Sequence, residues 1–444
     1  MLRARTPREL DPLVGGSVLL FWSKVAGNVG FFAAVLILAR ALGPTGRGTI
    51  AFLIVTVLVA AKLAGLGIGE ATAVFVAKRP EERGALFANV VLFMLGSGFV
   101  AAAVACGVLI ALGDIRPAGI GGPELAVIAL ATIVSALGDS GYVVLLGGNR
   151  LRAVAVVTAS ASWLYALILA VLWATVGLSV LRAALAWTAA EGIRAVAFIL
   201  QSRHGLERIR PRLDLLLEAI RFGSRAWVGS LARFLNFRTD QLLMGFLASE
   251  AALGIYAVAV NGSEVLLYLP AATATALLPA AARTETGVRA EQALRAFRSA
   301  AIVTVAAALA GAALGPILLP LVFGPAFDDS VAPFLWLLPG ALGFAATAVF
   351  SYALVAASAP GLSSIGPLVS LVVGIALDLV LIPRFGASGA AAAASAAFLA
   401  GGCAALLAFR RLHPFPWRAF ALPRRGDLVV FRALATPLRL VRSG

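Results

Sequence analysis

One apolar stretch near the middle of the chain, RFGSRAWVGSLARFLNFRTDQLLMGF, places four residues that are costly to put in lipid on one helical face. They are Arg225, Arg233, Asn236 and Asp240. On a continuous α-helix these positions fall within about 80° of one another, so they form a single polar stripe. A charge at this depth costs roughly 2.5 to 3.5 kcal/mol on insertion scales. We therefore expect the stripe to face protein, water or a polar ligand, and we predict that it carries the function.

A second polar stripe is expected near the N-terminus, where Lys24 and Asn28 share one side of another apolar segment. Four further apolar segments also group polar side chains. These groups are Lys62 and Glu70; Thr132, Ser135, Asp139 and Tyr142; Asn261, Glu264 and Tyr268; and Ser363, Ser370, Gly374 and Asp378. Several helices therefore turn polar faces toward something that they share.

Carboxyl groups inside these segments are candidates for ion coupling. Burial disfavours the charged carboxylate, and binding of a proton or a cation would neutralise its charge. The candidates are Asp139, Asp240, Glu264 and Asp378. A hydrogen bond between two helices is the alternative interpretation for each of them. For Asp240 we also weigh a role as a partner that tunes the arginines of the stripe.

Other intramembrane charges fit structural roles. Glu191 and Arg194 are three residues apart, a spacing that favours an ion pair on one helix. Arg238 falls at about 220° around its helix, away from the stripe, so we expect it to pair with a neighbouring helix or to extend toward the membrane surface.

These residues must be positioned by membrane-spanning helices. Of the 444 residues 61% are hydrophobic and only 13% are charged, a composition that excludes an ordinary soluble protein. Segments long enough to cross a hydrocarbon core recur along the whole chain. They lie at residues 14–41, 49–76, 85–112, 124–147, 153–177, 180–201, 222–247, 253–279, 299–323, 331–357, 361–383 and 387–410. We predict an all-α polytopic membrane protein with about twelve spans.

The charge distribution predicts the topology. Of the Lys and Arg residues in the connections, 25 fall on one side of the membrane and five on the other, so the positive-inside rule places both termini in the cytoplasm. The net charge of +15 then reflects topology and attraction to anionic lipid, not a nucleic-acid partner. With two histidines and two cysteines, the chain offers no metal cluster and no His-based catalysis, so we expect neither a metal nor a cofactor.

The longest polar interruption, SRHGLERIRPRLDLLLEA, divides the spans into six and six. An even number of spans returns the chain to its starting side, which is typical of two parallel repeats. We predict a cytoplasmic arm at 1–13, an N-lobe at 14–202, a linker at 203–221, a C-lobe at 222–412 and a basic cytoplasmic tail at 413–444.

Several segments in order resemble a known family. They are LARALGPTGRG, GLGIGEATAVFVAKR, RTDQLLMGFLASEAALGIYAVAVNGSEVLLYLP and LIPRFGASGAAAA. Together they resemble the polysaccharide-transporter branch, which includes the Wzx-type flippases, of the multidrug/oligosaccharidyl-lipid/polysaccharide (MOP) superfamily. The resemblance implies two six-helix lobes around a central cavity that carries an undecaprenyl-pyrophosphate-linked oligosaccharide across the bacterial inner membrane by alternating access.

The resemblance also implies a basic cavity that receives the pyrophosphate. We assign Lys24, Lys62, Arg225 and Arg233 to it, because arginine offers forked donors to phosphate oxygens. Asn28 and Asn236 are predicted to bind glycan hydroxyls. The implied partners are the lipid-linked oligosaccharide and anionic lipid, and a polymerase or glycosyltransferases of the same pathway are further candidates.

Four alternatives stay open. An ion-coupled exporter of cationic drugs has the same fold, but its site should favour acidic and aromatic residues. A lipid II flippase would carry a different glycan. A glycosyltransferase would need a metal site, for which only Asp328 and Asp329 are available, and these fit a polar turn better. A scaffold for envelope assembly would not transport. The chain lacks GxxxxGK[ST], so we expect a transporter without ATP hydrolysis, not an enzyme.

Overall fold

The computed structural model describes residues 12–421 apart from 207, 269, 275–285 and 358. Most of the predicted N-terminal arm and the end of the predicted basic tail therefore lie outside the described residues. Within the described residues every regular element is a helix, which confirms the predicted fold class. The chain forms two compact units, Met1–Leu231 with Ser249–Gly254, and Ala232–Ala248 with Ile255–Gly444.

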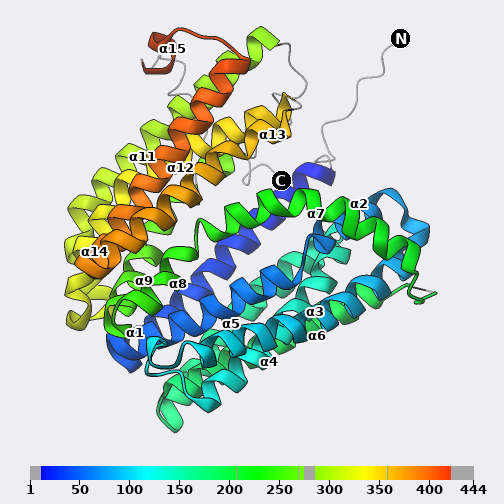
Figure 1. Cartoon of the computed structure of the whole chain (residues 1–444), viewed down its shortest axis with the longest axis horizontal. Helices are drawn as coiled ribbons and strands as arrows, with labels where there is room; N and C mark the ends of the chain where they lie inside the picture. The colour runs from blue at the N-terminus through cyan, green and yellow to red at the C-terminus, as the bar shows by residue number, and fades with distance from the viewer. Residues whose placement is uncertain (1–11, 207, 269, 275–285, 358, 422–444) are drawn as a thin grey trace, which may run out of the picture. The chain divides into compact units, whose positions relative to one another are not determined.

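The helices are labelled in Figure 1. Unit 1 contains α1 (Pro12–Ala64), α2 (Ile68–Lys78), η1 (Pro80–Glu82), α3 (Arg83–Ala111), η2 (Gly113–Ile115), α4 (Gly122–Gly147), α5 (Leu151–Thr175), α6 (Val180–Arg203) and most of α7 (Leu213–Leu235). Unit 2 contains α8 (Thr239–Leu247), most of α9 (Glu250–Glu264), η3 (Val265–Leu267), α11 (Thr286–Phe323), η4 (Pro325–Ser330), α12 (Val331–Ala356), α13 (Pro360–Ser363), α14 (Ile365–Leu412) and α15 (Trp417–Ala421). The division falls inside α7, whereas the predicted lobes divide at the linker 203–221.

Nine helical segments of the described chain are long and apolar enough to cross a membrane. Two of them suffice for two crossings each, because Trp22–Ala64 has 43 residues and Gly361–Leu412 has 52, whereas about 20 span a bilayer. Each is kinked at a glycine with positive φ, 66° at Gly43 and 54° at Gly386. Glycine adopts this backbone without the steric cost that a Cβ atom would add. With the interrupted segment α7–α8, the described residues account for twelve crossings.

The prediction of one continuous helix over residues 222–247 is wrong. α7 ends at Leu235 and α8 begins at Thr239. The polar side chains at the break bond to other helices of unit 2: the Asn236 amide donates to the Pro367 carbonyl at 2.8 Å, and Arg238 donates to Glu264 at 3.3 Å. These long-range contacts provide hydrogen-bond partners for the side chains at the break. Helical periodicity does not reveal these partners. Interrupted membrane helices occur where the backbone lines a cavity or is covered by protein.

The predicted span 49–76 is interrupted as well, between α1 and α2. Leu66 and Gly67 both have positive φ, 41° and 82°, and the strain at Leu66 costs roughly 1 to 2 kcal/mol. α7 packs closely on this break, because a Cβ atom built on Gly67 would lie 2.2 Å from the carbonyl oxygen of Gly223. The two glycines therefore let the backbones of α7 and the α1–α2 break meet directly.

A side chain at this contact should destabilise unit 1. A Cβ atom on Gly223 would lie 2.0 Å from the carbonyl oxygen of Gly67, and backbone cannot yield as a flexible side chain does. We expect Gly223→Ala to lower the free energy of unfolding by about 1 to 3 kcal/mol, measured as a lower Tm of the detergent-solubilised protein. Gly96→Ala is the matched control, because nothing lies within 4 Å of its Cβ position. An unchanged Tm for Gly223→Ala would contradict the close contact.

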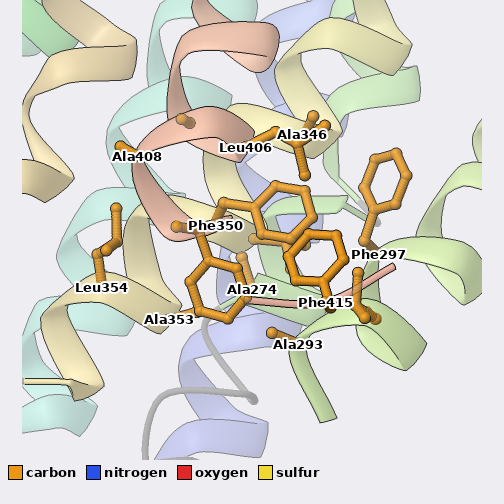
Figure 2. Packing of buried hydrophobic residues seen from close by; sticks show 14 residues of the cluster. Ala274, Ala293, Phe297, Ala346, Phe350, Ala353, Leu354, Leu406, Ala408 and Phe415 are labelled. Atoms are coloured by element: carbon orange, nitrogen blue, oxygen red, sulfur yellow. The ribbon is translucent and has the colours of Figure 1, made fainter. Parts of the chain in front are cut away.

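Aromatic packing holds α14 against α11 and α12 in unit 2. Figure 2 shows Phe297, Phe350 and Phe415 among alanines of the same cluster. Ring centroids of Phe350 lie 5.3 Å from those of Phe297 and Phe409. Closer to the kink of α14, the Ser395 hydroxyl accepts from the Gly340 amide at 3.0 Å. These contacts hold the second half of α14 in place. Asp378 lies in the first half of the same helix, before the kink at Gly386.

Candidate functional site

A small polar pocket in unit 2 lies where α8 begins after the helix break. Its volume is about 20 Å³, room for one or two water-sized species but not for a sugar ring. Two carboxylates line it, Asp240 of α8 and Asp378 of α14. The other lining residues are Leu235, Asn236, Thr239, Ser370, Leu371, Gly374, Ile375, Ala394, Ala397 and Phe398. The predicted polar face over 363–378 therefore turns three of its members, Ser370, Gly374 and Asp378, into this pocket.

The two carboxylates have different hydrogen-bond environments. Tyr256 of α9 donates its hydroxyl to Asp240, and the Gln241 amide donates to the same carboxylate at 2.7 Å. The Asp378 side chain is only 3% exposed, yet its Oδ1 has no partner among the described residues, and neither does the Ser370 hydroxyl. Buried polar atoms are nearly always bonded, because leaving one unpaired costs roughly 1 to 3 kcal/mol. A proton or an ion bound at Asp378 would satisfy this oxygen.

Neutral oxygens complete the pocket. Both amide hydrogens of Asn236 are used, on the carbonyls of Ala232 at 2.9 Å and Pro367 at 2.8 Å, which leaves its side-chain oxygen as an acceptor. Thr239 adds a hydroxyl beside it. No group of three or more His, Cys, Asp or Glu side chains that could hold a metal ion occurs in the described part of the chain. Two carboxylates with neutral oxygens suit a proton or a monovalent cation better than a divalent metal.

The remaining ion-coupling candidates are already paired with arginines. Asp139 of α4 lies 3.6 Å from Arg194 of α6, and Arg194 also binds Glu191 at 2.5 Å. The predicted structural pair of Glu191 and Arg194 is therefore confirmed. Glu264 lies 3.3 Å from Arg238, which confirms that Arg238 pairs with a neighbouring helix. Asp240, in contrast, bonds to Tyr256 and to no arginine of the stripe among the described residues, and its role as a partner that tunes the arginines stays a prediction.

Lys62 is also neutralised inside unit 1. Its Nζ atom lies 3.0 Å from Glu70 across the α1–α2 break, and the Ser230 hydroxyl of α7 donates to the same carboxylate oxygen at 2.6 Å. The Trp227 indole donates to the Lys62 carbonyl at 3.4 Å. This cluster ties α7 to both sides of the break. Sequence analysis grouped Lys62 with Glu70 but did not predict that they touch, because eight residues of continuous helix would set them about 12 Å apart along the axis.

Three predicted cations are exposed and unpaired. Lys24, Arg225 and Arg233 are exposed, and none has an acidic partner within 4 Å among the described residues. On α1, Gly27 and Gly30 pack against α5. Lys24 lies about one helical turn before Gly27, next to this contact, and Asn28 is half-buried. Lys24, Asn28, Lys62 and Arg225 belong to unit 1, and Arg233 and Asn236 belong to unit 2.

Sequence analysis also missed Tyr256 and Thr239 as members of the unit 2 pocket. Tyr256 lies in the apolar segment GIYAVAV and is fully buried. A buried tyrosine hydroxyl nearly always has a partner, which is the signal that could have linked it to a polar neighbour. Nothing in the local pattern identifies that neighbour as Asp240.

Comparison with known proteins places this geometry in context. The model of the family described as "Polysaccharide biosynthesis protein" matches residues 37–332. No curated protein sequence matches the chain. Among solved structures, a lipid II flippase MurJ in an inward closed conformation is similar with a TM-score of 0.76 and 12% identity, over 95% of this chain and 92% of that one. An inward-facing multidrug resistance MATE transporter of the MOP superfamily has a TM-score of 0.69 and 14% identity, over 87% and 94%. At these identities the two structures establish a shared fold.

Proposed function

This chain belongs to the polysaccharide biosynthesis protein family, and we propose that it is a flippase for a lipid-linked oligosaccharide of the bacterial inner membrane. It would move an undecaprenyl-pyrophosphate-linked glycan by alternating access for the export of a cell-surface polysaccharide. Its MOP-type fold and its long apolar helices support a transporter. Glycosyltransferases or a polymerase of the same pathway would be its partners, and both termini would be cytoplasmic.

The pocket of Asp240 and Asp378 is the observation that carries this proposal. It holds one ion-sized space, two carboxylates and a buried carboxylate oxygen with no partner among the described residues. Two adjacent carboxylates resist being ionised together, so binding of a proton or a monovalent cation neutralises one of them. A cation that binds more tightly in one state than in the other shifts the conformational equilibrium by that difference. The pocket would thus couple an ion gradient to the movement of the lipid-linked glycan.

The substrate would meet the unpaired cations. Lys24, Arg225 and Arg233 are exposed without acidic partners among the described residues, and a pyrophosphate leaving water needs compensating positive charge. Asn28 is suited to a glycan hydroxyl. We remove Lys62 from this set, because Glu70 neutralises it. Asn236 is assigned to the ion pocket, which is too small for a sugar ring.

An ion-coupled drug exporter is the second candidate, because MATE transporters share the fold. The 20 Å³ pocket excludes a drug molecule from the two carboxylates. The exposed cations would repel cationic drugs. A glycosyltransferase is less favoured, because Asp328 and Asp329 lie in η4, a short turn directly ahead of α12, as the polar-turn interpretation predicted.

Reconstitution tests the proposal. Purified protein in liposomes with a fluorescent undecaprenyl-pyrophosphate oligosaccharide in one leaflet should move it to the other leaflet faster under a proton or sodium gradient than without one. Protein-free liposomes are the control. Equal movement of lipid II would favour the lipid II flippase, and export of a cationic dye without glycan movement would favour the drug exporter. If no substrate moved under either gradient, the flippase function would be excluded and a scaffold role would remain.

A further inference from the structure

An open groove of about 490 Å³ lies in unit 1, along the first half of α7 and beside the end of α2. Its apolar wall consists of Phe75, Leu217 and Phe222. The rings of Phe75 and Phe222 lie 5.3 Å apart, and Leu217 and Phe222 are 45% and 44% exposed. This volume exceeds that of the ion pocket many times over, so it admits a chain or ring and not only an ion.

Two acidic side chains on the groove, Asp214 and Glu218, are already paired with arginines beside it. Glu218 receives two hydrogen bonds from Arg79, at 2.6 and 2.8 Å, and Asp214 binds Arg212 at 2.5 Å. The hydrogen bonds from Arg79 lower the pKa of Glu218, and those from Arg212 lower the pKa of Asp214. Both carboxylates are therefore ionised at neutral pH, and the two arginines that pair with them also share Glu82, at 3.5 Å from Arg79 and 3.3 Å from Arg212.

Two arginines on the groove are left without such compensation. Arg221 and Arg225 are exposed, and neither has an acidic partner within 4 Å among the described residues. They are four residues apart, so their side chains lie one helical turn apart on the same side of α7. Each guanidinium group can bind one phosphate group through its forked donors. Two such groups at this spacing suit a diphosphate better than the single phosphodiester of a bilayer phospholipid.

We propose that this groove is a loading site for the substrate lipid, where Arg221 and Arg225 bind the diphosphate and the exposed Leu217 and Phe222 contact the first isoprene units. The proposal rests on the flippase function proposed above and adds a site outside the ion pocket. The groove adjoins the linker that the charge distribution places in the cytoplasm, where lipid-linked precursors would be available. Arg225 is shared with the cations proposed to hold the pyrophosphate during transport, so it would pass the headgroup onward.

Binding of farnesyl diphosphate tests the site without transport. The full-length protein is placed in nanodiscs of phosphatidylcholine, and binding is measured by titration calorimetry. We expect Arg221→Gln to weaken binding about tenfold or more, as the loss of one charge-assisted contact predicts. Arg221 alone is replaced, because Arg225 is shared. Arg221→Lys keeps the charge but loses the forked donors, so its affinity should lie between those of Arg221→Gln and the unchanged protein. Arg210→Gln, an exposed linker arginine outside the groove, should bind within about twofold of the unchanged protein.

Three outcomes would overturn the site. Unchanged affinity in Arg221→Gln would show that the groove does not bind the diphosphate. Equal binding of farnesol would make the diphosphate irrelevant, and displacement of farnesyl diphosphate by an equal concentration of phosphatidylglycerol would assign the groove to bulk lipid. Binding that depends on Arg221, in a protein that moves no lipid-linked glycan in liposomes, would keep the loading site and refute the flippase. Glycan movement together with binding that does not depend on Arg221 would keep the flippase and refute the loading site.

Discussion

Asp378→Asn should abolish gradient-driven movement of the lipid-linked glycan while leaving the protein folded. Asparagine keeps the shape of the side chain but can neither accept a proton nor balance a cation. We expect the gradient-driven rate in liposomes to fall roughly 100-fold, which corresponds to about 3 kcal/mol, the scale of losing one member of a buried charge pair. Because Asp378 has a buried oxygen without a partner among the described residues, its neutralisation should not lower Tm.

The controls for this prediction come from other carboxylates of the chain. Asp329→Asn changes an exposed acid in η4 and should leave transport intact. Asp139→Asn breaks an ion pair with Arg194, so it should lower Tm more than it lowers the response to the gradient. Full gradient-driven transport in Asp378→Asn would show that the pocket does not couple the ion.

Arg233→Ala should strongly lower surface-glycan export while preserving the amount of protein in the membrane, and Arg225→Ala should do the same. Both arginines are exposed and lack acidic partners among the described residues, so their removal leaves no buried charge unpaired. A diphosphate would lose a forked contact, and we expect export to fall about tenfold to 100-fold. The measurement is surface glycan per cell in a strain that depends on this protein, with protein level read by immunoblot.

Arg384→Ala is the matched control, because Arg384 is an exposed arginine of α14 near the Gly386 kink, on the side predicted to be external. It should leave export unchanged. Normal export in both Arg225→Ala and Arg233→Ala would exclude these side chains as ligands of the pyrophosphate. A loss of export that Lys restores at either position would show that charge suffices without the fork.

Features with a local cause could be predicted from the sequence. Apolar segments of sufficient length predicted twelve crossings, because a bilayer imposes its thickness on every span. Kinks at Gly43 and Gly386 fall in short connections between predicted spans. The pair of Glu191 and Arg194 follows from a spacing of one helical turn. In each case the decisive interaction lies within a few residues along the chain.

The ion pocket depended on tertiary structure. Helical periodicity placed Asn236 and Asp240 on one stripe, and both line the pocket although the helix is interrupted between them. Asp378 reaches the same pocket from α14, and Tyr256 binds Asp240 from α9. Sequence analysis named Asp240 and Asp378 among four carboxyl candidates, and only the structure showed that the other two are paired with arginines.

By itself, the sequence determined that this is a helical membrane protein with basic and acidic groups inside its spans. The length of each apolar segment and the charged residues within it can be read directly from that segment. Which charges neutralise one another was decided by the tertiary structure. Lys62 and Glu70 meet across a left-handed turn between α1 and α2. The Oδ1 atom of Asp378 is buried without a partner among the described residues, in a pocket that α8 and α14 line together. Such pairings depend on contacts between distant segments, and no local pattern specifies them.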